Sequence, residues 1–311
     1  MSEITVSMVK ELRERTQAGM SDCKNALVEA NGDLDAAVDV ILKKGIVKAA
    51  SRSGRIATEG EVRTWVAKDG LGGLIVEVNC QTDFVARGDE FRNFVGNIVD
   101  VASKLPRGSD LTAQKYPGTD RSVDDVRQEM VAKTGENTVV RRWDRIDAGA
   151  NGGNALVHAY IHAGGKLAVL IHAEAPSAAA RANAEFVSFL DNCAMQVAAM
   201  SPIVVKKEQV SQADLDKQKE IFAAQLKEEG KPEQAWPKII EGKVAKWFTE
   251  VTLLGQQNVW DPEKGTIDQI RQDLSKKLEG DVVVHTFVRF GLGEGIEKKV
   301  DDLAAEVAKM M

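Results

Sequence analysis

The pattern of the chain changes most sharply at one stretch, Glu77-Val78-Asn79-Cys80-Gln81-Thr82-Asp83-Phe84-Val85-Ala86-Arg87. The apolar run before Asn79 is typical of a strand, and a polar tip and a charged, helix-starting segment follow it. Thr82 or Asp83 is a natural N-cap for that helix. Phe84 is then either a core residue, which is the default for phenylalanine, or an apolar side chain held out for a partner. Its place in the first helical turn favours the second interpretation.

The composition is typical of a globular protein that binds another protein. The chain has 311 residues, which suggests roughly two domains, and 43% hydrophobic with 28% charged residues is ordinary for a globular fold. A net charge of -6 argues against a nucleic-acid partner, and 5% aromatic content argues against a stacking surface for single strands. No apolar run approaches the ~18 residues of a membrane helix. We therefore expect no direct nucleic-acid contact and no membrane contact.

The N-terminus and the cysteines predict a cytoplasmic protein. Charged residues fall within the first turns of the chain, so a signal peptide is not expected. The cysteines are scattered and odd in number, at Cys23, Cys80 and Cys193. They predict neither a disulfide framework nor a zinc site, which fits a reducing compartment.

Residues 1–46 predict three short helices around one small core. The third helix has the clearest period, because its apolar residues recur at i, i+3, i+4, i+7 and i+8 from Leu34. Asp33 is the expected N-cap of this helix, and Gly45 its expected end. Residues 47–60, rich in small and basic residues, are expected to form a linker. The positions expected to pack are Val9, Leu12, Cys23, Ala26, Leu27, Ala30, Leu34, Ala37, Val38, Ile41 and Leu42.

The central part of the chain contains an internal repeat and predicts an α+β fold. Each copy has a β-hairpin pattern followed by an amphipathic helix with two phenylalanines three residues apart: Phe91 and Phe94, then Phe186 and Phe189. This pattern suits a helix packed on a small antiparallel sheet. A late apolar run is expected to complete the second sheet, and a further helix is expected over residues 123–133. The repeat divides the core into subdomain N, residues 61–148, and subdomain C, residues 149–203 and 248–291.

Residues 204–247 are expected to form a helical hairpin inserted into subdomain C. Two amphipathic patterns flank the helix-breaking Gly230-Lys231-Pro232. The hairpin is expected to pack on itself as an antiparallel coiled coil, or against a second copy of the chain in a homodimer. Residues 292–311 are expected to form a C-terminal helical module.

The sequence lacks the patterns of catalytic, cofactor and metal sites. It has neither a G-x-x-x-x-G-K-[ST] phosphate loop nor a G-x-S-x-G motif. The glycines of Gly291-Leu292-Gly293-Glu294-Gly295 have the wrong spacing for a dinucleotide loop, so a turn is expected there. His158 and His162 would share one strand face with Tyr160, but a third ligand is not evident. We expect no catalytic residue, no cofactor and no metal, in a protein that is not an enzyme.

Two segments resemble the signatures of the elongation factor Ts family. One is the stretch quoted first, and the other is Leu12-Arg13-Glu14-Arg15-Thr16-Gln17-Ala18-Gly19-Met20-Ser21-Asp22-Cys23-Lys24-Asn25-Ala26-Leu27. They lie in the family's order and at about its spacing, with shorter matches at Tyr160-Ile161-His162, Gly230-Lys231-Pro232 and residues 290–297. The resemblance implies a guanine nucleotide exchange factor of translation elongation, whose partner is elongation factor Tu in its GDP-bound and nucleotide-free forms. It also implies that the N-terminal bundle is similar to ubiquitin-associated domains.

The resemblance also implies which residues contact the partner. Thr82, Asp83, Phe84 and Val85 match the family segment that enters elongation factor Tu near its nucleotide and magnesium, and that displaces both until GTP binding releases the factor. Arg13 and Met20 match contacts with the partner's nucleotide-binding domain, and His162 matches a position close to the interface. The chain departs from the family at Ser21, where an apolar residue is frequent, and at Gly255-Gln256-Gln257-Asn258-Val259-Trp260, which lacks the family's Pro and Phe.

Two other classes of function are compatible with the residues. A ubiquitin-associated-type adaptor would bind its partner without changing nucleotide release. An enzyme with a cryptic nucleotide site is disfavoured by the missing phosphate loops. The rate of GDP release from elongation factor Tu separates all three classes.

Overall fold

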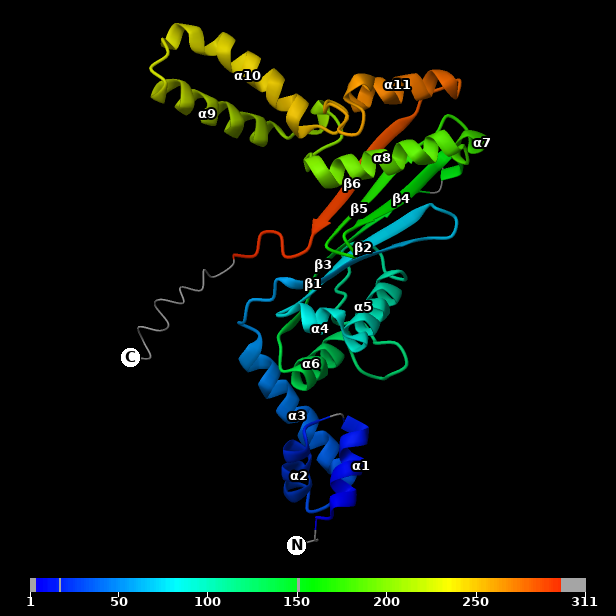
Figure 1. Cartoon of the computed structure of the whole chain (residues 1–311), viewed down its shortest axis with the longest axis vertical. Helices are drawn as coiled ribbons and strands as arrows, with labels where there is room; N and C mark the ends of the chain where they lie inside the picture. The colour runs from blue at the N-terminus through cyan, green and yellow to red at the C-terminus, as the bar shows by residue number, and fades with distance from the viewer. Residues whose placement is uncertain (1–3, 17, 150–151, 298–311) are drawn as a thin grey trace. The chain divides into compact units, whose positions relative to one another are not determined.

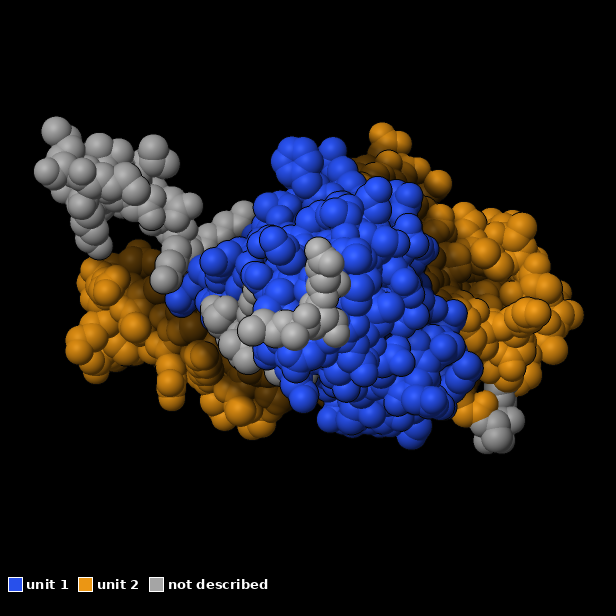
Figure 2. Space-filling model, turned by 90° about the horizontal axis from the view of Figure 1, so that it is seen from below, with its two compact units in different colours: residues 1–62, 76–142, 291–311 blue, residues 63–75, 143–290 orange. Residues whose placement is uncertain are grey.

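The computed structural model describes residues 4–16, 18–149 and 152–297. The described residues form an α+β fold with two three-stranded sheets, as the sequence predicts (Figure 1). Contacts divide the chain into two compact units: unit 1 contains residues 1–62, 76–142 and 291–311, and unit 2 contains residues 63–75 and 143–290 (Figure 2). The finer sequence-based domain boundaries stay a prediction. In the part of the chain that the structure describes, none of the helices has the length and apolar character that crossing a membrane requires.

Unit 1 begins with the expected three helices, α1 (Val6–Thr16), α2 (Met20–Glu29) and α3 (Leu34–Arg52). Their core consists of Val9, Leu12, Cys23, Ala26, Leu27 and Ala37, with Ala30, Leu34, Val38 and Ile41 packed against it. Asp33 accepts a hydrogen bond from the Ala36 amide at 2.9 Å, so the expected N-cap is confirmed.

The prediction that α3 ends at Gly45 is wrong, because the helix continues to Arg52 through the first part of the expected linker. A glycine inside a helix costs roughly 1 kcal/mol relative to alanine. Packing of α3 on α6 (Val123–Thr134) offsets that cost. The last turn is also anchored, since the Arg52 guanidinium donates to the Val131 carbonyl at 3.2 Å.

The first sheet has the order β1-β2-β3, built from β1 (Glu59–Val66), β2 (Gly72–Cys80) and β3 (Thr138–Asp147). The hairpin β1–β2 is the predicted one. Strand β3 was not predicted, because it is rich in charged residues and half-buried along most of its length. Two helices follow β2: the short α4 (Asp83–Arg87) and α5 (Asp89–Ala102), which buries Phe91 and Phe94.

The second sheet belongs to unit 2 and has the order β4-β5-β6, from β4 (Ala155–His162), β5 (Leu167–Glu174) and β6 (Val283–Gly291). Strands β4 and β5 are antiparallel, from the pair Ala155 and Glu174 to the pair His162 and Leu167. The late strand therefore completes this sheet, as predicted. Helix α8 (Ala184–Met200) packs along it and buries Phe186 and Phe189 (Figure 1). Shorter elements complete this unit, and the sequence analysis predicted none of them: η1 (Gly152–Asn154), α7 (Ala178–Arg181), η4 (Pro262–Lys264) and α11 (Ile267–Lys277).

The helical hairpin consists of α9 (Gln212–Glu228) and α10 (Trp236–Val251), which lie side by side (Figure 1). Short 3-10 turns, η2 (Lys207–Gln209) and η3 (Glu233–Ala235), precede the two helices. The chain reverses at Gly230, whose φ of 67° is in the left-handed region that favours glycine. Leu226 is the one buried residue of α9, and α10 has none. The homodimer stays a prediction, and the expected C-terminal module lies mostly outside the described residues.

Candidate partner-binding site

Phe84 lies on the surface at the second position of α4. Its side chain is 84% exposed, so the core interpretation is wrong. Thr82 is the N-cap of α4, and its hydroxyl oxygen accepts from the Val85 amide at 3.4 Å. None of the five residues of α4 is buried. The short helix therefore presents the Phe84 ring to solvent without a core contact of its own.

Two residues from the turn between α6 and β3 hold the segment that leads into α4. The Glu136 carboxylate accepts from the Thr82 amide at 3.0 Å and from the Thr82 hydroxyl at 2.7 Å. The Asn137 amide donates to the Gln81 side-chain oxygen at 2.8 Å. Hydrogen bonds to an ionised carboxylate are roughly twice as strong as neutral ones, so this contact fixes the N-cap of α4. Sequence reasoning missed Glu136, because it lies more than fifty residues from Thr82 and no local pattern connects them.

Asp83, the first residue of α4, is engaged only weakly. Its carboxylate forms an ion pair with Arg87 one turn later at 2.9 Å, with both side chains substantially exposed. Exposed pairs of this kind contribute little to stability and exchange partners readily. The Asp83 carboxylate is therefore accessible from solvent.

A buried carboxylate fixes the end of β2 from which this segment leaves. The Glu77 side chain is fully buried and pairs with Arg141 at 2.8 Å and Arg142 at 2.6 Å. It also accepts from the Asn79 side chain at 3.1 Å and from the Gly293 amide at 2.7 Å. Four donors satisfy the charge, which is the condition under which a buried carboxylate is tolerated.

The turn after β6 contributes to this network. Gly293 has φ 70°, and a Cβ there would lie 2.7 Å from the Thr58 carbonyl oxygen, so glycine is required. The Glu294 carboxylate accepts from the Gly291 amide at 3.2 Å and closes the turn. The prediction of a turn in place of a dinucleotide loop is confirmed.

Cys80, at the end of β2, has a structural role. The Cys80 thiol donates to the Thr82 carbonyl at 3.2 Å. Burial, with the charges of Glu136 and Glu59 as smaller contributions, raises the pKa of the Cys80 thiol to about 12. A thiol that stays protonated at neutral pH is a poor nucleophile. All three cysteines are free and buried, as expected without a disulfide framework.

Arg13 and Met20 are both exposed on the N-terminal bundle. Met20 begins α2 directly after the N-cap Gly19, and its side chain is 41% exposed. Ser21 beside it is exposed as well. Nothing in the bundle core depends on the Met20 side chain, which leaves it available for a contact.

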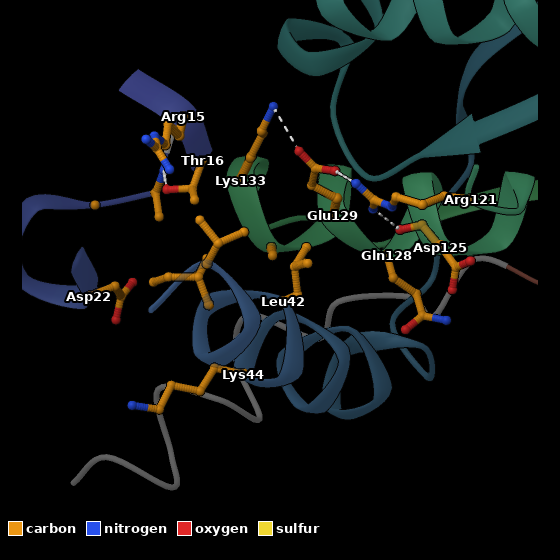
Figure 3. Close-up of a pocket in the computed structure, with 15 residues that line it drawn as sticks. Arg15, Thr16, Asp22, Leu42, Lys44, Arg121, Asp125, Gln128, Glu129 and Lys133 are labelled. Carbon is orange, nitrogen blue, oxygen red and sulfur yellow. Dashed lines mark hydrogen bonds and ion pairs between the residues drawn. The ribbon is translucent and has the colours of Figure 1, made fainter. Parts of the chain in front are cut away.

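A pocket of about 360 Å³ lies between this bundle and α6, within unit 1 (Figure 3). Its lining is mixed in charge. Glu129 pairs with Arg121 at 2.5 Å and with Lys133 at 3.3 Å. Leu42, expected in the bundle core, lines this pocket instead. Because the charges neutralise one another, the pocket does not present a uniform field to an anion or a cation.

His162 is exposed at the end of β4, in unit 2. Its Nδ1 lies 3.0 Å from the Tyr160 hydroxyl, while His158 pairs with Asp191 at 3.1 Å. The structure thus brings Thr82, Asp83, Phe84 and Val85 together on one short helix, while His162 belongs to the other compact unit. Among the described residues, the group whose ligand atoms lie close enough to hold a metal ion is a different one: His172, Glu174 and His285.

The segment that departs from the family pattern is well anchored. Gln196, which is fully buried on α8, donates to the Gln256 side-chain oxygen and to the Gln257 carbonyl, both at 3.1 Å. Its own oxygen accepts from the Val259 amide at 3.1 Å. These three hydrogen bonds of the buried Gln196 side chain fix the loop on α8.

Comparison with known proteins decides the family. A family model described as Elongation factor TS matches residues 81–294, more than half of the chain. The chain is 42% identical over 309 residues to Elongation factor Ts of Clostridium perfringens (strain SM101 / Type A), covering 99% of both proteins. It belongs to the elongation factor Ts family. Other relatives of the same name, from Clostridium tetani and a Nitratiruptor species, are 43% and 41% identical over 313 and 308 residues, again with 99% of each chain covered. Membership in the elongation factor Ts family supports a role in nucleotide exchange during translation elongation.

Proposed function

We propose that this chain is a guanine nucleotide exchange factor that binds elongation factor Tu and uses Asp83 and Phe84 as a wedge. The observation that carries the proposal is the exposed Phe84 ring on a short helix whose N-cap is held by Glu136. Single exposed apolar side chains are common on protein surfaces, so the exposed ring supports the proposal only together with its place in the family signature. The resemblance of residues 77–87 to the family signature supports elongation factor Tu as the partner.

The wedge acts on the partner's magnesium and phosphate contacts. Magnesium demands near-ideal octahedral geometry, so an apolar ring placed beside the ion and its waters weakens its binding. Displacement of the adjoining phosphate loop removes backbone amide contacts to GDP. No covalent bond changes in these steps, which fits a protein that is not an enzyme.

Exchange follows from thermodynamic linkage. If binding of this chain weakens GDP binding by some factor, GDP must weaken binding of this chain by the same factor. GTP displaces the chain by the same reciprocity, and the cycle can begin again. Arg13 and Met20 on the bundle and His162 on β4 provide the additional contacts that hold the partner while its nucleotide leaves.

Calorimetric titration tests the linkage directly. The chain is titrated into nucleotide-free elongation factor Tu and, separately, into the same protein saturated with GDP. We expect much weaker binding to the GDP-saturated form, and an equal weakening of GDP binding in the reverse experiment. Equal affinity for both forms would remove linkage from the mechanism and leave an adaptor.

The helical hairpin is predicted to be dispensable for exchange. The chain enters and leaves it at adjacent points, since the Ile203 amide bonds to the Val251 carbonyl and the Leu253 amide to the Val204 carbonyl, both at 2.9 Å. Replacing residues 213–246 by a short Gly/Ser bridge should retain most GDP-release activity. Complete loss of activity in a variant with native circular dichroism would show that the hairpin takes part in exchange.

Glu136 is predicted to position the wedge without touching the partner. Glu136→Ala removes both hydrogen bonds to Thr82, and each bond to a charged acceptor contributes about 1.5–3 kcal/mol. We expect faster amide hydrogen exchange over residues 81–88 and a several-fold lower rate of GDP release, with partial recovery in Glu136→Gln. Unchanged amide exchange in Glu136→Ala would mean that α4 is positioned by other contacts.

A further inference from the structure

Two histidines and a glutamate lie on one face of the second sheet, outside the wedge. His172 and Glu174 are two residues apart on β5, and His285 lies on β6, its hydrogen-bonded neighbour. Side chains two apart in a strand share a face. The alternating residues Ile171, Ala173 and Val284 belong to the core that includes the buried face of α8. The three polar side chains therefore project from the opposite face of the sheet.

The three side chains have the spacing of metal ligands. One ligand atom from each lies within 4.8 Å of the others. Glu174 Oε2 and His285 Nε2 are 3.3 Å apart. Two ligands of a tetrahedral zinc ion, each about 2.0–2.1 Å from the metal, stand roughly 3.3 Å from each other. The Glu174–His285 pair already has this separation. A movement of about 1.5 Å brings the ligand nitrogen of His172 to the same distance from the other two ligand atoms.

The histidine nitrogens lack the partners that burial demands. His172 is only 9% exposed, and its Nε2 is buried without a hydrogen-bond partner. Nε2 of His285 also has no hydrogen bond, although it lies beside the Glu174 carboxylate. The two rings stack with their centroids 4.8 Å apart. Buried polar atoms are nearly always satisfied, and an ion is one of the groups that satisfies them.

The site opens to solvent on one side. The side chains of His285 and Glu174 are 38% and 43% exposed, which gives an ion a path from solvent.

We propose that His172, Glu174 and His285 bind a divalent transition-metal ion, with Zn²⁺ as the best fit and water as its fourth ligand. Two imidazoles and one carboxylate suit zinc, whereas magnesium and calcium prefer oxygen ligands alone. The ion joins β5 to the late strand β6. This site does not depend on the proposed exchange function. Spacing in the sequence does not predict it, because the ligands come from strands more than a hundred residues apart.

Metal titration of the full chain tests the site. The protein is freed of metal by dialysis against a chelator, then titrated with Zn²⁺ in a calorimeter and with Co²⁺ by visible absorption. We expect one ion per chain, a tetrahedral Co²⁺ spectrum, and a higher melting temperature with Zn²⁺. His172→Asn and Glu174→Gln should each weaken Zn²⁺ binding at least ~10-fold, since even outer partners of metal ligands contribute that much.

His158→Asn is the matched control, because His158 lies in the same sheet but pairs with a single acid, Asp191. It should bind Zn²⁺ as the unaltered chain does. If His172→Asn fails to fold, the exposed Glu174→Gln decides alone. Absence of saturable binding in the unaltered chain would overturn the proposal, and so would undiminished affinity in a folded Glu174→Gln variant.

Discussion

Phe84→Ala is expected to slow the catalysed release of GDP from elongation factor Tu by an order of magnitude or more. Aromatic anchors at interfaces typically contribute ~2 kcal/mol or more, and 1.4 kcal/mol corresponds to ten-fold in rate or affinity. The loss should appear in the release rate at saturating concentration of the variant, because the proposed wedge acts while the nucleotide is leaving. Stopped-flow fluorescence of labelled GDP measures it.

The same substitution should leave the stability of the chain almost unchanged. Phe84 is 84% exposed on a helix without buried residues, so its truncation removes little packing. Phe91→Ala is the matched control, since Phe91 lies on the buried face of α5 and is only 2% exposed. It should lower the free energy of unfolding by ~3–5 kcal/mol. A steep fall in the melting temperature of Phe84→Ala would contradict the exposed placement, and unchanged release would remove Phe84 from the mechanism.

Glu77→Ala is expected to be among the most destabilising single substitutions in unit 1. It leaves Arg141 and Arg142 without their carboxylate, and it deprives the Asn79 side chain and the Gly293 amide of an acceptor. Removing one partner of a buried ion pair typically costs ~3–5 kcal/mol. Chemical denaturation measures the loss.

Asp120→Ala is the control for Glu77→Ala. Asp120 forms an ion pair with Lys115 at 2.5 Å, but its side chain is almost fully exposed. Exposed ion pairs contribute little, so the midpoint of unfolding should hardly move. Equal midpoints for the two variants would show that the Glu77 network does not stabilise the fold.

Local periodicity made part of this fold predictable from the sequence. The bundle core, the two hairpins and the paired phenylalanines of α5 and α8 follow from apolar spacing within single elements, which reports directly which face is buried. These features depend on neighbouring residues alone. The exposure of Phe84 was favoured by its position in the first turn after an N-cap, together with the resemblance of residues 77–87 to the family signature.

The remainder depends on contacts between distant residues. Strand β3 is rich in charged residues, and two of them, Arg141 and Arg142, form ion pairs with the buried Glu77. Its sequence therefore lacks the alternation of apolar and polar residues that is typical of a strand. Helix α3 continues beyond Gly45 because it packs on α6. Glu136 and the group of His172, Glu174 and His285 are each assembled only when segments far apart in sequence meet. Composition and spacing cannot show such contacts.

The most direct test of the account is the rate at which labelled GDP leaves purified elongation factor Tu with and without this chain. Stopped-flow traces should accelerate with increasing concentration of the chain and approach a plateau, and the acceleration should be largely lost with Phe84→Ala. An unchanged release rate, at concentrations where the two proteins form a complex, would contradict the account and identify the chain as a binding adaptor.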